Sequence, residues 1–330
     1  MAGRGLAGIA EATGVSKMTV SRVLRGAAGF SDATRQRVLQ EAERQGYVPN
    51  RLAAAFGSQT SELVGLCVPT LGAPLLARAV EALAATLDRF GYQTVVGTHE
   101  GAADVEERWL RSLAAWRPAA VVVAGSVRSE AALALLAQMS CPVLEFWSGP
   151  AEPVDFAVSL DHAGDGARTA RCFLEARRRR IGFVGTVGPA AGPQAQRLEG
   201  FRAALGDAAV APVLQLLPDR SGFYPGLYGT EMLLARRPDL DAIFYADDEM
   251  AIGGIAYLER SGRRIPGDVA VAGWGGAEAR AILRQRLTTH AVPSARIGRL
   301  GGEALLARLS GREVEARRIV NAEFVRGDTV

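Results

Sequence analysis

Short apolar runs alternate with helical stretches from residue 63 to residue 275, and this pattern constrains the fold most strongly. Strands are predicted at 63–70, 92–99, 119–126, 141–147, 156–160, 180–187, 213–218, 242–247 and 268–275. Helices are predicted between them, at 73–91, 104–117, 130–139, 195–206 and 249–262. Such alternation predicts doubly wound parallel sheets with binding sites at the carboxyl ends of the strands. Two rounds of it predict an α/β body of two lobes with a cleft between them.

Size and composition indicate a globular chain of more than one domain. With 330 residues, 48% of them hydrophobic and 22% charged, the chain exceeds what one hydrophobic core usually holds. No window approaches the roughly 18 apolar residues that cross a bilayer, and the first residues contain no long apolar run. We therefore expect a cytoplasmic protein with no membrane partner.

Neither cysteine nor histidine forms a pattern typical of a metal, redox or catalytic site. The cysteines stand far apart among apolar neighbours, and the histidines are equally scattered: Cys67, Cys141, Cys172, His99, His162 and His290. The glycines of 182–192 lack the GxGxxG spacing, and no GxxxxGK[ST], GxSxG or HExxH motif occurs. We expect reduced core cysteines, no metal ligands, no cofactor and no catalytic residues. The basic run 176–182 is interpreted as a solvated helix end.

The first residues carry the pattern of a helix-turn-helix. Leu6, Ile9 and Ala10 form one helical face, and Val20 and its neighbours 23–24 form a second. Between them Gly14 permits the tight turn, because it lacks a Cβ atom. Residues 1–60 hold eight basic and four acidic side chains, whereas the remainder of the chain is nearly neutral. A compact basic head on a neutral body is typical of a nucleic-acid-binding module.

The second helix of this head presents polar side chains to solvent. Ser16 is placed to cap the helix, and Lys17, Met18, Ser21 and Arg22 lie on its exposed face, where they can meet base edges and phosphates in a major groove. A third helix is predicted from Ser31 or Asp32 to residue 46. The predicted domains are therefore a DNA-binding head at 1–48, a linker at 49–62 and an α/β domain at 63–330.

Three segments of the head resemble the DNA-binding head of the LacI family of bacterial transcription regulators. They are GVSKMTVSRVLRG, SDATRQRV and GYVPNRLA, in that order. The resemblance implies an all-α helix-turn-helix head followed by a two-lobed, periplasmic-binding-protein-like effector domain. It also implies that the linker at 49–62 is a hinge and that 63–330 is the effector-binding and dimerisation domain. By position, Phe56 replaces the family's hinge leucine, which acts as a minor-groove wedge. The implied DNA-binding residues are Ser16, Lys17, Met18, Thr19, Ser21, Arg22, Ser31, Tyr47, Asn50, Arg51, Ala53 and Phe56.

Family motifs in the second part imply ligand-binding residues. QRLEGF resembles the R-x-x-G-F signature, whose arginine binds sugar hydroxyls or a carboxylate, and this residue is Arg197. ADDEMAIGG resembles A-N-D-x-x-A-x-G, in which the family uses one acid for ligand and one for capping. These acids are Asp247 and Asp248, and a helix cap is an equally good interpretation of Asp248. VSLDHAGDGA resembles V-x-x-D-N-x-x-G, which places Asp161 near the cleft.

One departure from the family pattern bears on the ligand. Residues 273–275 read GWG where many sugar-binding members have G-x-D, and a less acidic pocket suits an anionic ligand. The segments SKMTVSR, GYQT, PVLEFW with Glu145, and SGFYPG resemble the gluconate-repressor subgroup. The resemblance therefore implies a sugar acid such as gluconate as effector, with Arg197 on its carboxylate and Tyr224 or Trp274 as a wall.

The leading hypothesis is a ligand-switched repressor that binds double-stranded operator DNA as a homodimer. Its effector, a sugar acid or sugar, would shift the lobes and hinges between two arrangements. The chain ends without the leucine heptads of the family's tetramers, so we expect a dimer. The alternative is an enzyme or sensor of a sugar acid with an accessory head, which the lack of a nucleophile and base disfavours.

Overall fold

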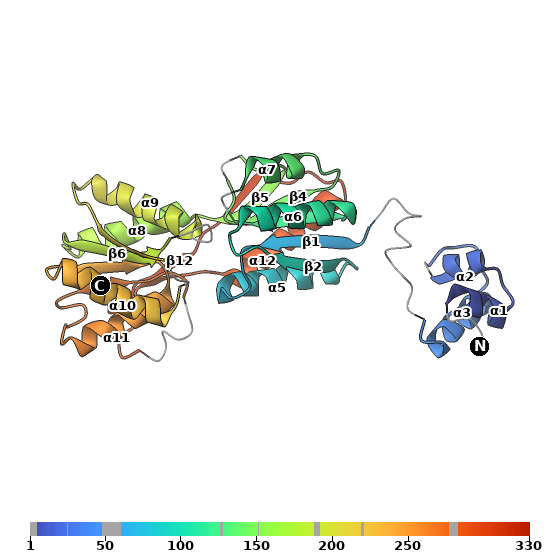
Figure 1. Cartoon of the computed structure of the whole chain (residues 1–330), viewed down its shortest axis with the longest axis horizontal. Helices are drawn as coiled ribbons and strands as arrows, with labels where there is room; N and C mark the ends of the chain where they lie inside the picture. Colours follow the sequence, from blue (N-terminus) through green and yellow to red (C-terminus); the bar gives the residue numbers. More distant parts are fainter. Residues whose placement is uncertain are drawn as a thin grey trace. The chain divides into compact units, whose positions relative to one another are not determined.

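The computed structural model describes residues 5–24, 26–47, 61–125, 128–150, 152–187, 192–218, 221–276 and 283–330. Internal contacts divide the chain into two units, Met1–Ser61 and Glu62–Val330 (Figure 1). Most of the predicted hinge, including Asn50, Arg51, Ala53 and Phe56, lies outside the described residues. The predicted domain boundaries within it stay predictions.

The first unit is a helical bundle with its own core. Its helices are α1 (Leu6–Thr13), α2 (Lys17–Leu24) and α3 (Asp32–Arg44). Gly14 ends α1 with a left-handed backbone at φ 69°, a conformation that glycine adopts without strain. The core combines the predicted faces of α1 and α2 with α3, through Ile9, Ala10, Val20, Val23, Val38 and Ala42.

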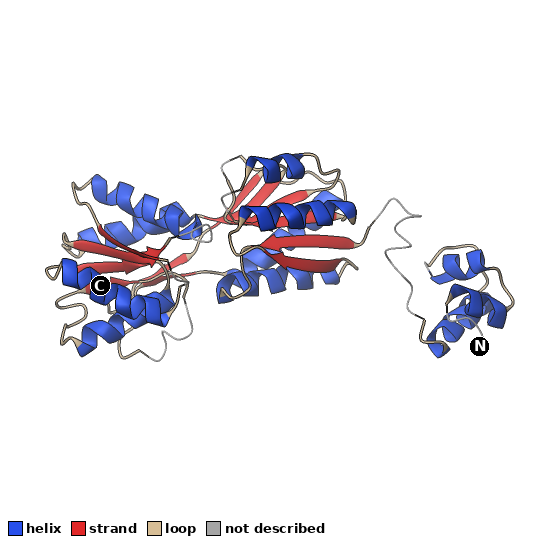
Figure 2. Cartoon of the chain, viewed as in Figure 1, coloured by secondary structure: helices blue, strands red, loops and turns tan. Residues whose placement is uncertain are grey.

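The second unit begins with a six-stranded parallel sheet, in the order β11-β5-β4-β3-β1-β2. Its strands are β1 (Leu63–Val68), β2 (Gln93–Thr98), β3 (Ala120–Ala124), β4 (Val143–Trp147), β5 (Phe156–Leu160) and β11 (Arg317–Val320). Helices α5 (Pro74–Asp88) and α12 (Ser294–Leu309) pack on one face, α6 (Ala103–Ala115) and α7 (Glu130–Ala137) on the other (Figure 2). Both faces are covered, which explains why the central strands β1, β3, β4 and β5 are nearly continuous apolar runs, whereas the edge strands β2 and β11 are more polar.

The second lobe is a four-stranded parallel sheet in the order β7-β6-β8-β9. Its strands are β6 (Ile181–Thr186), β7 (Val213–Leu217), β8 (Ala242–Tyr245) and β9 (Ala270–Ala272). Its helices are α8 (His162–Glu175), α9 (Gly192–Gly206), α10 (Phe223–Arg236) and α11 (Asp248–Arg260). A two-stranded antiparallel ribbon joins β10 (Thr289–Ala291) to β12 (Glu323–Val325).

The chain passes between the lobes at three places: from β5 to α8, from β10 to α12 and from β11 to β12. The predicted two-lobed α/β fold is confirmed, and each of the nine predicted strand ranges contains an observed strand. No range was predicted for α8, α10, α12 or β10 to β12. The last three strands have only three or four residues, too few for a periodic signal, and glycine and proline interrupt α10. None of the described helices is long and apolar enough to cross a membrane.

Candidate ligand site and nucleic-acid interface

Arg197 lies in α9 and is only 2% exposed. Its Nη1 donates to Nδ1 of His162 at 3.0 Å, and its Nη2 donates to the carbonyl oxygen of Ala246 at 2.8 Å. Its Nε is buried without a hydrogen-bond partner in the described structure. Burial lowers the pKa of Arg197 to about 10, and burial followed by the Arg197 charge lowers the pKa of His162 to about 3. The site therefore contains a cationic guanidinium beside a neutral imidazole.

Trp274 lies against this guanidinium, and Trp147 lies against Trp274. The Cζ atom of Arg197 lies 3.8 Å from the ring centroid of Trp274, a cation–π contact. The indole of Trp147, at the end of β4 in the first lobe, meets Trp274 edge to face with centroids 6.5 Å apart. Since Trp274 follows β9 in the second lobe, the aromatic contact joins the two lobes beside Arg197.

Asp165 binds the indole N–H of Trp274. Its Oδ2 accepts from Nε1 of Trp274 at 2.8 Å, and its Oδ1 lies 3.3 Å from Nδ1 of His290 and also contacts Arg168. Burial alone would raise the pKa of Asp165, but the contacts with His290, Trp274 and Arg168 outweigh it and lower the pKa. Asp165 thus links α8 to both Trp274 and the crossover strand β10.

The two acids at the start of α11 divide their roles in the opposite way to the helix-cap interpretation of Asp248. Asp247 is the helix cap, because its Oδ1 accepts from the amide of Met250 at 2.9 Å. Asp248 is 1% exposed and accepts from Oγ1 of Thr289 in β10 at 2.6 Å. The interpretation of Asp248 as the cap is wrong. Burial raises the pKa of the partly buried Asp247 to about 6.

Two glycines allow α8 and α9 to pack at backbone contact. A Cβ atom at Gly166 would lie 1.9 Å from the carbonyl oxygen of Arg197, and one at Gly200 would lie 2.0 Å from that of Ala163. This close approach brings Arg197 against His162 in the first turn of α8. Gly200, the glycine of the R-x-x-G-F motif, therefore permits the helix packing that positions Arg197.

The remaining predicted ligand residues lie elsewhere or have another partner. Asp161 caps α8 by accepting from the amide of Gly164 at 2.9 Å. Glu145 is fully buried and accepts from Nη1 of Arg128 at 2.7 Å, so its carboxylate is committed within the first lobe. Tyr224 is 79% exposed at the start of α10 and does not form a buried wall. Trp274 forms one, stacked on Arg197.

Sequence reasoning missed three residues of this site: His162, Asp165 and His290. In the V-x-x-D-N-x-x-G pattern His162 stands in place of the asparagine and Asp165 in place of the glycine. These departures were the available signal. His290 had none, because it lies in a three-residue strand that joins the site only in the folded chain.

The head presents a polar helix to solvent, as expected for a reading helix. Oγ of Ser16 accepts from the amide of Thr19 at 3.0 Å and so caps α2. Lys17, Met18 and Arg22 are exposed, Met18 at 73%. Among the other predicted contacts, Ser21 and Tyr47 are partly buried, and exposed Ser31 caps α3. Because Met18 is so exposed, its apolar side chain has no packing role in the head.

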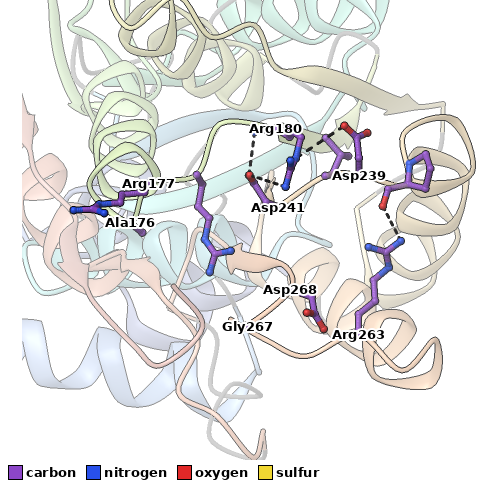
Figure 3. Close-up of a pocket in the computed structure, with 11 residues that line it drawn as sticks. Ala176, Arg177, Arg180, Asp239, Asp241, Arg263, Gly267 and Asp268 are labelled. Atoms are coloured by element: carbon purple, nitrogen blue, oxygen red, sulfur yellow. Dashed lines mark hydrogen bonds and ion pairs between the residues drawn. The ribbon is translucent and has the colours of Figure 1, made fainter.

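The basic run at 176–182 borders a surface pocket of about 410 Å³ in the second lobe (Figure 3). Figure 3 shows Arg180 directed at Asp241. The nitrogen–oxygen distance of this pair is 3.5 Å, and Arg263 donates to the carbonyl oxygen of Pro238 at 2.9 Å. Asp268 pairs with Arg264. Acidic side chains thus pair with some of the arginines around this pocket, and backbone carbonyls accept hydrogen bonds from others. This agrees with a solvated helix end.

A helix-turn-helix head joined to a two-lobed ligand-binding fold defines a ligand-regulated DNA-binding protein. Residues 6–50 match the model of bacterial regulatory proteins of the lacI family, and residues 170–330 match the periplasmic binding protein-like domain. The regulator GntR of Pseudomonas aeruginosa is 30% identical over 310 residues, covering 93% of this chain and 89% of its own. The chain belongs to the LacI family of transcriptional regulators.

Solved structures agree with this assignment. A LacI-family regulator from Silicibacter pomeroyi is 36% identical, with a TM-score of 0.92 over 98% of both chains. The regulator CelR in complex with cellobiose is 26% identical, with a TM-score of 0.70 over 99% of both chains. These relatives are transcriptional regulators, so the chain is a DNA-binding regulator and not an enzyme with an accessory head.

Proposed function

We propose that this regulator is a repressor of genes for sugar-acid metabolism, switched by a sugar acid such as gluconate that binds Arg197. The observation that carries the proposal is the buried and unpaired charge of this residue. In the described part of the chain, no carboxylate oxygen lies within 4.0 Å of a guanidinium nitrogen of Arg197. Its two hydrogen bonds go to neutral acceptors, and its Nε has none.

A buried cation without a direct ion pair is costly; Asp247, Asp165 and Asp248 stabilise the Arg197 charge only at longer range, and a bound carboxylate would add a direct pair. Guanidinium has five N–H donors in a planar fork, and Arg197 uses only two of them on protein atoms. The remaining donors suit the bidentate recognition of a carboxylate. The nearby acids are engaged with their own donors: Asp165 with Trp274, Asp247 with Met250 and Asp248 with Thr289.

The relatives support the same ligand class by name only. GntR-named regulators of Escherichia coli and Pseudomonas aeruginosa are 26% and 30% identical to this chain. A neutral sugar is the second candidate, because CelR was solved with cellobiose. Neutral sugars would leave Arg197 without a directly paired carboxylate, which is why we favour an acid.

The proposed switch acts by differential binding. A ligand that contacts Arg197 in the second lobe and the Trp147 side of the first lobe would stabilise one arrangement of the lobes. That arrangement would favour or disfavour docking of two heads of a homodimer on a pseudo-palindromic operator. Because operator DNA is the target, we place the protein in the cytoplasm. The predicted hinge at 49–62 would transmit the change.

Thermal-shift screening of the full-length protein against matched acid and neutral sugars tests the ligand class. Gluconate, idonate and galactonate would be compared with glucose, cellobiose and the corresponding lactones at equal concentrations. An acid present at 100 times its dissociation constant should stabilise the fold by about 2.7 kcal/mol. Operator binding, followed by fluorescence anisotropy, should change with the same compound. Stabilisation by neutral sugars alone would overturn the sugar-acid proposal and leave the regulator assignment intact.

A further inference from the structure

A cluster of potential metal ligands is buried in the first lobe, apart from the Arg197 site. Cys67 in β1, His99 directly after β2 and Glu106 in the first turn of α6 each offer one ligand atom, and these atoms all lie within 4.8 Å of one another. Their exposures are 0%, 6% and 2%. From Cys67, Glu106 and a ring nitrogen of His99 we infer a site for one divalent cation of zinc type.

The fold brings these residues together for a definite reason. Parallel pairing of β1 with β2 aligns Cys67 with Gly97 and Val68 with Thr98, so His99 follows at the carboxyl edge beside Cys67. A Cβ atom at Gly97 would lie 2.5 Å from the ring of Trp109 in α6, so this face of the sheet looks toward α6. Residues two positions apart in a strand share a face. Glu106 approaches the same edge from the first turn of α6.

His99 provides a second and independent sign of a missing partner. Its Nε2 is buried without a hydrogen bond of full geometry in the described structure, the ring has a weaker contact with the backbone of Ala124, and its Nδ1 accepts from the amide of Gly101 at 3.2 Å. A buried ring nitrogen without a partner is costly. The Gly101 contact places the ring proton on Nε2, so metal binding at Nε2 requires this proton to move to Nδ1, which breaks the 3.2 Å contact with the Gly101 amide.

The charges around the cluster also favour an added cation. Glu145 and Glu106 both approach Arg128, Glu145 by a hydrogen bond of 2.7 Å and Glu106 by a contact of 3.3 Å to Nε that makes no hydrogen bond. Two carboxylates therefore share one guanidinium, for a net charge of −1 when both are ionised. A divalent cation and an ionised Cys67 bring the cluster to neutrality, which a buried group requires.

In the metal-free cluster burial shifts each ligand toward its uncharged form. Burial, followed by the Glu106 charge, raises the pKa of Cys67 to about 12. Burial raises the pKa of Glu106 and lowers that of His99. A bound cation would favour the ionised forms of Cys67 and Glu106 and the neutral form of His99, because thiolate, neutral imidazole and carboxylate are its ligands. The set of one sulfur, one nitrogen and one oxygen donor matches the ligand types of zinc.

The test is metal binding by the chelator-treated full-length protein, by equilibrium dialysis against Zn²⁺ and by absorption spectroscopy with Co²⁺. We expect one Zn²⁺ per chain, a rise in melting temperature on its addition, and a thiolate-to-cobalt charge-transfer band. Dialysis is prolonged and repeated on protein refolded with the metal, since the site is buried. Cys67→Ser should abolish the cobalt band and weaken Zn²⁺ binding at least tenfold.

Cys172→Ser is the matched control, because Cys172 is also a buried free cysteine but lies in α8. It should bind Zn²⁺ like the parent. Glu106→Gln and His99→Asn should each weaken binding at least tenfold, and Glu106→Gln decides the matter if Cys67→Ser does not fold. The inference is overturned if the parent binds no Zn²⁺ by either route. It is also overturned if Cys67→Ser and Glu106→Gln bind it like the parent.

Discussion

The indole of Trp274 stacks on the guanidinium of Arg197, with 3.8 Å between the Cζ atom and the ring centroid. The same indole donates its N–H to Asp165 at 2.8 Å. One side chain therefore fixes the plane of the cation and is itself fixed by a buried carboxylate. The orientation of Arg197 depends in this way on residues that need not touch a ligand.

Removal of the guanidinium should abolish the effector response. Arg197→Ala should weaken binding of the sugar acid by about 2 to 5 kcal/mol, because a charge-assisted pair is lost. Arg197→Lys should recover little of this, since an ammonium cannot reproduce the planar fork. Calorimetry measures the affinity, and anisotropy without effector should show unchanged operator binding. Arg202→Ala, an exposed position on the same helix, is the control; equal affinity in both alanine variants would exclude Arg197 from the site.

Loss of the indole N–H should weaken both the fold and the site. Trp274→Phe leaves the buried Asp165 carboxylate with one donor fewer, at an expected cost of about 1 to 3 kcal/mol in the free energy of unfolding. In a chain that already carries Asp165→Asn, the same Trp274→Phe change should lower the free energy of unfolding by less. A double-mutant cycle followed by urea denaturation would measure this difference. Trp116→Phe, at a 41% exposed position, serves as the control. Additive single effects in the cycle would contradict a coupling between Asp165 and Trp274.

Close helix packing at Gly166 should be intolerant of a methyl group. Gly166→Ala places a Cβ atom 1.9 Å from the Arg197 carbonyl oxygen, so α8 and α9 must separate. We expect the free energy of unfolding to fall by about 1 to 3 kcal/mol and effector binding to weaken. Gly206→Ala has open space in α9 and should be neutral or slightly stabilising. Thermal denaturation of both variants gives the comparison, and equal melting temperatures would refute it.

The neutral imidazole of His162 should make the protein less stable in acid. Its pKa is about 3 in the fold, below the usual 6.5, so the unfolded chain binds the extra proton between these values. Stability therefore falls as the pH drops below 6.5. From pH 6.5 to pH 5 the loss from this residue amounts to about 2 kcal/mol. Urea denaturation at pH 7 and pH 5 should show His162→Asn losing correspondingly less than the parent; an identical loss would contradict the lowered pKa.

Base preference should depend on the exposed residues of α2. Replacing Lys17 and Met18 together by alanine should change relative affinities among operator variants by about 1 to 3 kcal/mol per lost base contact. Arg37→Ala, an exposed position on α3, should weaken all sequences alike. Competition binding on a randomised half-site library measures both. Unchanged preferences in the double variant would show that α2 does not read bases.

Local patterns were sufficient to predict the elements that have strong periodicity. Ile9, Ala10, Val20 and Val23 form the head core as their spacing predicted, because helical faces repeat every three to four residues. Buried parallel strands were equally visible as apolar runs. The short strands near the end of the chain were not, since three or four residues establish no period. Arg197 and Trp274 were found through motifs, and the structure brings them into contact.

What the sequence determined by itself is therefore the order of the strongly periodic elements, the α/β class and the apolar faces of the helical head, all of which follow from neighbours along the chain. Tertiary structure alone decided which polar groups share a site. His290 reaches Asp165 only because β10 crosses between the lobes, and Cys67 meets His99 and Glu106 only through strand register and the placement of α6. Burial and pairing of these groups depend on distances across the fold, and sequence spacing carries no information about such distances until the chain has packed.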